Sequence, residues 1–331
     1  MFQIDICAAT DEISLSLCSA FKTTMVFAIF AFVINIILCT YAFSHTSYSP
    51  LTVIFRLLLV IDGIHSAGYM LDSFSVLLNL PGNSRTDFKE YPGFTVEQTY
   101  ALLSKDKHMV RIIDCAVYKP FLFFILLARQ WSAMIAFVIG LERSLQIFYP
   151  LWFKTIKLKR TPIVLFTLSF NLLSCSIAYI NSLFVSPLEE TYYSCEVTWA
   201  FGENYGWCQS AVIIAEYLGG WILSGYAFCI TQRPSALIHF GNQKEKISAE
   251  RRRTRKALWL TTACLIFNGL PQGGLMLLRM RSNYNDADLK QYVASMFLAK
   301  SVANIFLHFI VNDTFRRLLR KVFENYFLFK T

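Results

Sequence analysis

Charged side chains are scarce in this sequence. Asp, Glu, Lys and Arg together make up 16% of its 331 residues, whereas an average soluble domain has about 25%. Hydrophobic residues reach 55%, aromatic residues 16%, and the mean hydropathy is +0.44. So few charges cannot cover the surface of a soluble protein of this size. The composition excludes a soluble enzyme with one modest core, a disordered chain and a small disulfide-rich protein, and it favours an integral membrane protein.

Sequence motifs of enzymes, metal sites and nucleic-acid-binding modules are also missing. The chain has no glycine-rich loop that could hold phosphates, its five His are scattered, and its nine Cys lack the spacing of zinc ligands. We therefore expect no enzyme activity and no cofactor. The net charge of +9 comes from basic clusters that flank apolar stretches, which does not indicate a nucleic-acid-binding protein.

Seven apolar stretches are long enough to cross a bilayer, which requires about 20 mostly apolar residues. Their approximate ranges are 22–44, 51–79, 116–141, 163–185, 209–231, 257–279 and 292–311. Acidic residues precede the first stretch, unlike the basic start of a signal peptide, so we expect it to remain as a span. The sequence predicts an all-α membrane protein, a seven-transmembrane helix bundle formed by a single domain over residues 1–331.

The placement of Lys and Arg predicts the orientation of this bundle. They are more numerous in the connections that face inward when the amino terminus is extracellular, so we expect a cytoplasmic carboxyl terminus and a plasma-membrane location. In residues 312–331, apolar residues recur at helical spacing, with Arg and Lys on the opposite side. This pattern predicts a short amphipathic helix that lies on the inner membrane surface and is attracted to anionic lipid.

Residues at several depths of the predicted spans match the motifs of one family. The third span ends in Glu142-Arg143; the other matching positions are Asn35, Leu58, Asp62, Pro271, Asn304 and His308. Spans four and five lack the family's Trp and Pro, and Gly269 stands where span six has a Trp. The chain resembles the rhodopsin-like G-protein-coupled receptors, and in its departures it is most similar to the nematode serpentine chemoreceptors.

The resemblance implies a receptor, with a chemosensory role, that turns binding of an extracellular ligand into activation of a heterotrimeric G protein. Arg143 would pair with Glu142 at rest and meet the G protein on activation, while Pro271 would supply the kink of span six. Asn304 and His308 belong to the same switch. The basic run 251–256 on span six would repel Arg143, so we expect a weak resting ion pair and appreciable basal signalling.

A polar core is also implied near the middle of the membrane. In the family, an Asp in the place of Asp62 holds a sodium ion together with residues that correspond to Ser132, Ser301 and Asn304, close to Asn35. Lys300 precedes Ser301, so we hypothesise that its ammonium group replaces the sodium ion. The alternative is that Lys300 pairs elsewhere or extends to the membrane surface.

Arg129 is the candidate ligand-binding residue. It precedes Arg143 by fourteen residues, or about 21 Å along a helix, at the depth of the family's ligand pocket. It could bind an acidic ligand, or it could pair with Asp72 or Glu216 within the bundle. The outer loop 186–209 is acidic and aromatic and would attract cations instead, so the sign of the ligand's charge stays open.

Five Cys fall on the predicted outer side, where oxidation is possible: Cys7, Cys18, Cys115, Cys195 and Cys208. We favour a Cys115–Cys195 disulfide between the outer end of span three and the second outer loop, with Cys195–Cys208 as the competing bridge. Two other functions remain open: a transporter or ligand-gated channel that uses Asp62, Arg129 and Lys300 as a path, and a protein retained for assembly or trafficking. No repeat symmetry of the transporter kind is evident.

Overall fold

The computed structural model describes residues 12–44, 50–77, 109–149, 160–192, 195–197, 199–233, 244–280, 286–311 and 316. The long helices are α1 (Glu12–Ser44), α2 (Pro50–Leu77), α5 (Leu122–Phe148), α7 (Arg160–Ile180), α8 (Glu203–Gln232), α10 (Lys244–Cys264), α11 (Leu270–Met280) and α12 (Asp286–Val311). The short elements are strands β1 (Met109–Arg111) and β2 (Glu190–Tyr192), helix α4 (Ile112–Tyr118), and π-helical segments η1 (Asn181–Val185) and η2 (Leu265–Gly269).

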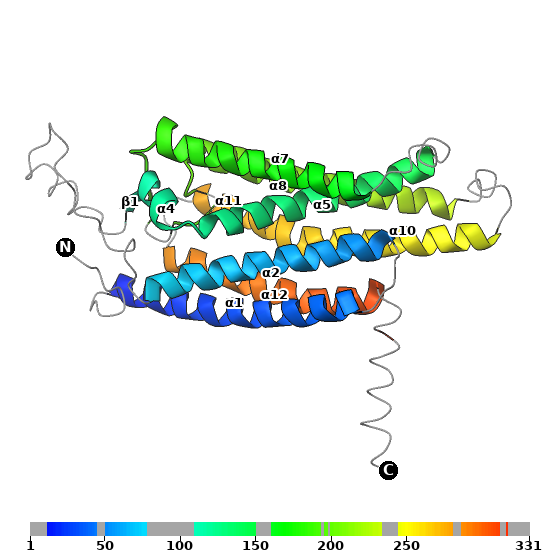
Figure 1. Ribbon diagram of the computed structural model, residues 1–331, viewed down its shortest axis with the longest axis horizontal. Coiled ribbons are helices and arrows are strands. Elements are labelled where there is room, and N and C mark those ends of the chain that lie inside the picture. Colours follow the sequence, from blue (N-terminus) through cyan, green and yellow to red (C-terminus); the bar gives the residue numbers. More distant parts are fainter. Residues whose placement is uncertain are drawn as a thin grey trace, which may run out of the picture.

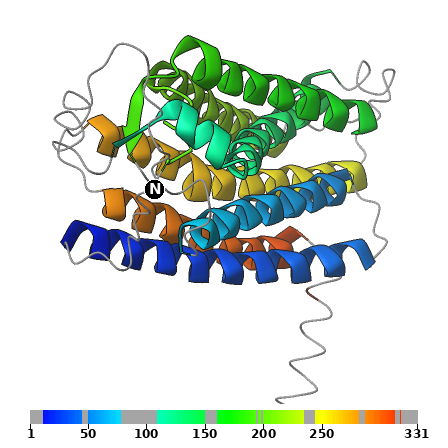
Figure 2. The same ribbon diagram turned by 60° about the vertical axis from the view of Figure 1, so that its left-hand side comes forward.

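The long helices run side by side along the longest axis of the molecule (Figures 1 and 2). Helix α1 packs against α2 and α12, α5 packs against α2 and α8, and α10 lies against α8. Helix α5 is the central one, because 72% of its most apolar stretch is buried, compared with 28% in α1 and α8. We call the end that carries β1, β2 and α4 the cap end, and the end where α10 begins the basic end (Figure 1).

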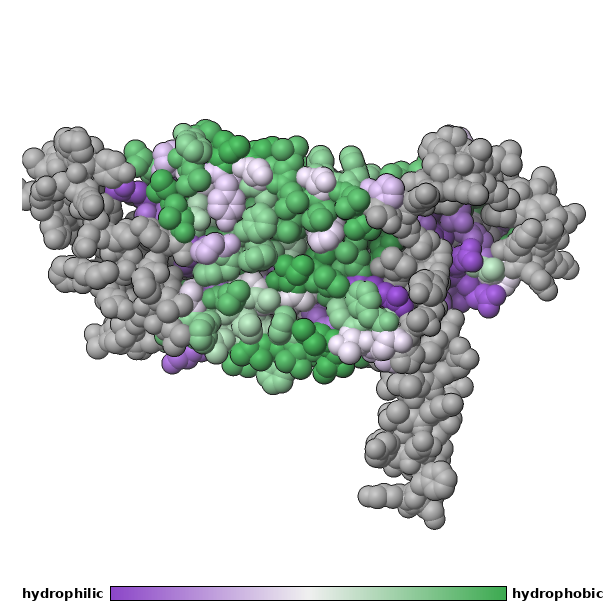
Figure 3. Space-filling model, viewed as in Figure 1, coloured by the Kyte–Doolittle hydropathy of each residue, from purple (hydrophilic) through white to green (hydrophobic). Residues whose placement is uncertain are grey.

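Among the residues that the structure describes, four helices are long and apolar enough to cross a membrane: Cys18–Ser44, Leu122–Phe148, Pro162–Val185 and Glu203–Gln232. Their outward faces carry exposed apolar side chains, such as Phe30, Phe166 and Ile222, and Figure 3 shows apolar surface over the middle of the bundle. These features bear out the expectation of a helical membrane protein, because soluble proteins rarely expose so much contiguous apolar surface to water.

The second, sixth and seventh predicted spans overlap α2, α10–η2–α11 and α12, which are not among these four helices. Helix α2 carries Arg56, Asp62 and Asp72, and α12 carries Lys300, so only the shorter part Ala299–Ile310 is strongly apolar. The sixth is divided into three helical segments. Seven spans and their orientation stay a prediction, and the predicted amphipathic tail lies outside the described residues except for Arg316.

The cap end is held together by a disulfide and a small strand pair. Strand β1 pairs antiparallel with β2, with Val110 opposite Thr191. The Cys115–Cys195 disulfide, with a Cα–Cα distance of 5.7 Å, ties α4 to the chain just after β2. This confirms the favoured bridge and makes the alternative wrong, because Cys208 is free and exposed. Cys18 is disulfide-bonded as well.

Helices α5 and α8 approach each other closely at two glycines. A Cβ atom added to Gly140 would lie 2.8 Å from the Cα of Gly220, and one added to Gly220 would lie 2.8 Å from the carbonyl carbon of Ala136. Side chains at these positions would therefore force the helices apart. The contact fixes the position of α5, which carries both Arg129 and Arg143.

Candidate functional site

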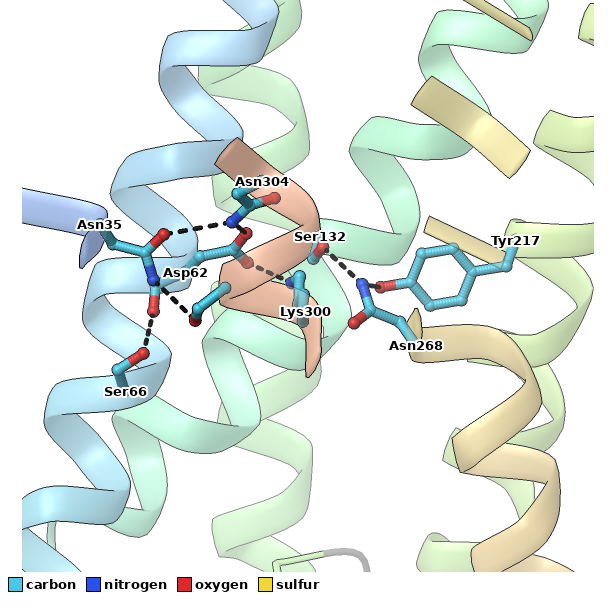
Figure 4. Close-up of polar contacts among 9 residues, drawn as sticks. Asn35, Asp62, Ser66, Ser132, Tyr217, Asn268, Lys300 and Asn304 are labelled. Atoms are coloured by element: carbon cyan, nitrogen blue, oxygen red, sulfur yellow. Dashed lines mark hydrogen bonds and ion pairs between the residues drawn. The ribbon is translucent and has the colours of Figure 1, made fainter. Parts of the chain in front are cut away.

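Buried polar side chains of α1, α2 and α12 meet halfway along the bundle (Figure 4). Asn304 Nδ2 donates to Asp62 Oδ2 (2.8 Å) and lies 3.1 Å from Asn35 Oδ1, while Asn35 Nδ2 donates to Ser301 Oγ (3.4 Å). Exposed fractions of 0% for Asn35, 4% for Asp62 and 5% for Asn304 show that these groups face one another rather than lipid. We call these four residues, with Lys300, the middle network.

Lys300 supplies the positive charge of the middle network. Its Nζ forms an ion pair with Asp62 Oδ1, so each carboxylate oxygen of Asp62 has a donor. The ammonium group therefore takes the place in which the resemblance implies a sodium ion. The contact is the one hypothesised from the sequence, but its role in signalling stays a hypothesis.

Asn268 of η2 extends these contacts toward α5 and α8. It is hydrogen-bonded to the Tyr217 hydroxyl (2.9 Å) and lies 3.5 Å from Ser132 Oγ. With its amide turned over, which matches the polarity of its neighbours better, its oxygen accepts a hydrogen bond from Lys300 Nζ (3.2 Å). Ser132 was expected beside Asp62, but its hydroxyl group contacts Asn268 of η2. Lys300 thereby links the middle network to η2, which directly precedes α11 and its Pro271.

Arg129 lies nearer the cap end and has two partners from other elements. Its guanidinium donates to Glu196 Oε1 (2.7 Å) and to the Tyr69 hydroxyl, and it lies over the Tyr69 ring. Glu196 follows Cys195, so the disulfide holds its carboxylate above α5. We call Arg129, Tyr69 and Glu196 the cap-end network.

The sequence-based partners of Arg129 are placed differently. Asp72 forms a buried ion pair with Lys119 (3.4 Å), and Glu216 of α8 is half-buried. Glu196 could not be predicted as a partner of Arg129 from the sequence, because it lies on a loop whose path cannot be derived from helical spacing. Its position next to a disulfide cysteine is the signal that could have identified it.

At the basic end, Arg143 is held by two carboxylates. Its Nη2 atom lies 3.0 Å from Glu142 Oε1, and its Nη1 atom lies 3.4 Å from Glu250 Oε1 of α10. These three residues, which we call the basic-end network, are largely buried: the side chains are 3% exposed for Arg143, 13% for Glu142 and 9% for Glu250.

The expectation that span six repels Arg143 is wrong. Consecutive residues of a helix point about 100° apart, so Glu250 faces α5, whereas Arg252 and Arg253 are exposed. Arg253 also pairs with Glu250 (3.6 Å). The Glu142–Arg143 ion pair is therefore supported from α10, which removes the reason for expecting appreciable basal signalling.

A cavity of about 60 Å³ lies between the cap-end and middle networks. Its wall includes Arg129, Lys300 and His65, together with Ser132, Tyr217, Phe267, Asn268, Pro271, Gln272, Tyr292 and four apolar or small residues. Such a volume holds a few water molecules, whereas ligand pockets usually measure about 300–1,000 Å³. Ligand binding here would require the helices to separate.

Two departures from the family's motifs have a local explanation. A Cβ atom at Gly269 would lie 3.1 Å from Tyr217 Cβ and 2.8 Å from Leu265 Cδ1, so Tyr217 of α8 occupies the space that a side chain at 269 would need. His308 is buried and forms an edge-to-face contact with Tyr41 of α1 at 5.4 Å between ring centroids. It packs between α12 and α1, one turn after Asn304.

A search against models of protein families gives no match, and a search of curated proteins gives no significant match. Function must therefore be argued from the geometry of this chain.

Proposed function

We propose that this protein is a seven-transmembrane G-protein-coupled receptor with a chemosensory role. The observation that carries the proposal is the arrangement of the three networks along one bundle. Arg129 and Arg143 lie on the same helix, separated by about 21 Å, and the middle network lies between their levels. Each network ties α5 or α12 to a helix or loop that is distant in sequence.

The run α10–η2–α11 supplies a connection between the cavity and the basic end. Asn268, Pro271 and Gln272 of this run line the cavity, and Glu250 of the same run holds Arg143. A π-helical segment within a helix often marks a functional site, and η2 lies beside the Lys300 contact. A ligand that prefers a different position of this run would release Arg143 by shifting the population between two helix packings.

The ligand would occupy the cavity between the cap-end and middle networks. Both cations on its wall already have carboxylate partners, Glu196 for Arg129 and Asp62 for Lys300. An anionic ligand would therefore have to compete with Glu196, whereas a neutral polar ligand could use the amide and hydroxyl groups of Asn268, Gln272 and Tyr217. We favour a small ligand, because the cavity has room for a few water molecules.

The deciding experiment measures G-protein nucleotide exchange without ligand in cells that express Glu250→Gln, which lacks the α10 carboxylate that holds Arg143. Glu250→Gln is compared with Glu250→Gln/Arg143→Ala, and surface expression is measured for both. We expect Glu250→Gln to raise exchange above the level of untransfected cells and the added Arg143→Ala to return it to that level, because the double variant lacks the cation that meets the G protein. Undiminished exchange in the double variant at equal surface expression would refute the proposal.

The rival transport function is tested in reconstituted vesicles. Asp62, Arg129 and Lys300 are each paired with a fixed group, which favours a static network over a path for ions. Solute flux or current that depends on these residues would favour a transporter or channel instead.

A further inference from the structure

A groove opens between α8 and α10 at the basic end. Its volume is about 460 Å³, and it is lined by Phe228 and Gln232 of α8 and by Ile247, Ser248, Arg251, Arg252 and Arg255 of α10. It lies far from the cavity described above, and the receptor mechanism proposed here does not use it.

The groove is strongly cationic. Three guanidinium groups line it, and none of its lining residues is acidic. Arg251 Nε donates to the Thr231 carbonyl oxygen (2.7 Å), which holds this side chain against the wall of the groove. Within the described part of the chain, Arg252 and Arg255 are exposed and have no ion-pair partner. Glu250 of the same helix faces Arg143 on another side of α10. Three like charges in one groove favour binding of an anion.

The groove also lies at the boundary of an apolar surface. Helix α8 is apolar enough to cross a membrane and ends at Gln232. With α8 across a bilayer, the groove would lie at the level of the lipid headgroups. Toward the middle of the bundle, Trp221 and Ile222 of α8 and Trp259 of α10 are 40%, 57% and 52% exposed. These two helices are joined there by a hydrogen bond from Trp221 Nε1 to Thr262 Oγ1 (3.1 Å).

We propose that this groove binds the headgroup of an anionic phospholipid that carries phosphate monoesters. Guanidinium groups bind phosphate oxygens through paired hydrogen bonds, and three of them match a headgroup with more than one phosphate. The acyl chains would lie along the exposed apolar side chains of α8 and α10. This continuity with apolar surface favours a lipid over a soluble phosphate or an acidic protein segment. The proposal does not depend on coupling to a G protein.

The test uses the full chain in nanodiscs of phosphatidylcholine that contain phosphatidylinositol bisphosphate, with binding measured by native mass spectrometry. Arg252→Gln and Arg255→Gln are compared with Arg253→Gln, which removes an exposed charge from the same helix but not from the groove. We expect binding to weaken about fivefold for each groove arginine, while Arg253→Gln binds like wild type. Soluble inositol phosphate without acyl chains should bind much more weakly than the lipid.

Three results would overturn the proposal. Equal weakening in all three variants would show general attraction to a basic surface rather than a site. Equal affinity for soluble inositol phosphate would show a phosphate site that does not recognise lipid. Absence of selective lipid binding in wild type, or wild-type binding by both groove variants, would leave the groove to another occupant such as an acidic protein segment.

Discussion

The Lys300 ammonium lies in the interior of the bundle, where an unpaired charge would cost several kcal/mol. Its ion pair with Asp62 and the hydrogen bond from Asn304 to the same carboxylate offset this cost. Removal of one partner leaves the other charge without compensation, which is more harmful than removal of both. This asymmetry allows the pair to be tested.

We predict that Lys300→Met lowers stability by about 3–5 kcal/mol. The double variant Lys300→Met/Asp62→Asn should recover a large part of this loss, because it leaves no buried charge. Thermal unfolding of the detergent-solubilised chain measures both effects. If the double variant were less stable than Lys300→Met alone, Asp62 would not be the group that Lys300 neutralises.

Sodium dependence gives a second prediction at the same site. Wild type should unfold at the same temperature in sodium and potassium chloride, because the ammonium group occupies the cation position. Lys300→Met should become more stable in sodium than in potassium, since Asp62, Ser301 and Asn304 are then available to a small cation. A strong sodium effect in wild type would contradict a resident ammonium.

Residue spacing identified the depth of a side chain but not all of its partners. The resemblance groups Asp62 with Asn304 at a sodium site, and Lys300 is added because it precedes Ser301 in the sequence. The structure brings these side chains together. Glu250 and Glu196 were missed for different reasons. Glu250 directly precedes the basic run 251–256, and the prediction from that run took no account of the side of α10 on which each residue lies. Glu196 lies on a loop whose position depends on the disulfide.

Glu250 gives a prediction about the resting state. Glu250→Gln removes the carboxylate that α10 offers to Arg143, so α10 should move away more readily. We expect basal G-protein nucleotide exchange to rise about fivefold. Glu203→Gln, which removes an exposed carboxylate at the cap end, serves as a control for loss of one acidic charge. Basal exchange equal to wild type in Glu250→Gln would mean that the ion pair does not restrain α10.

At the scale of elements, the sequence predicted the strongly apolar helices best. Predicted spans one, three, four and five correspond to helices that are apolar enough to cross a membrane. The break of the sixth at η2 and the pairing of β1 with β2 could not be predicted. A π-helical segment leaves the apolar pattern almost unchanged, and two strands of three residues depend on a disulfide between segments separated by 80 residues.

The contact of α5 with α8 gives a prediction for an element. Gly220→Ala should destabilise the chain markedly, because the new Cβ would overlap the backbone of Ala136 and Phe137. Gly63→Ala is the matched control, since no atom lies within 4 Å of a Cβ there. Alanine stabilises a helix by about 0.5–1 kcal/mol relative to glycine. Gly63→Ala should thus unfold at or above the wild-type temperature and Gly220→Ala well below it; equal temperatures would show that the close contact is absent.

At the scale of the whole molecule, the number and direction of spans depend on the membrane as well as on the helices. Helices α2, α10–η2–α11 and α12 carry charged groups that are paired inside the bundle. Asp62 pairs with Lys300 in the middle network, and Glu250 pairs with Arg143 in the basic-end network. A helix that buries its charges against neighbours can cross a bilayer although its composition is less apolar. The pairing of these charges inside the bundle thus supports the prediction, made from the apolar stretches, that all seven segments cross the membrane.

Orientation can be tested with cysteines that the chain already contains. Cys208 lies near the cap-end start of α8, is free and is exposed, whereas Cys175 and Cys264 are free but buried. If the cap end is extracellular, a membrane-impermeant maleimide should label intact cells, and Cys208→Ser should abolish this labelling. Cys229 is also free and exposed and lies near the other end of α8. It should react with the maleimide only in permeabilised cells. Labelling of Cys208 that required permeabilised cells would place the cap end inside and reverse the topology on which the receptor proposal depends.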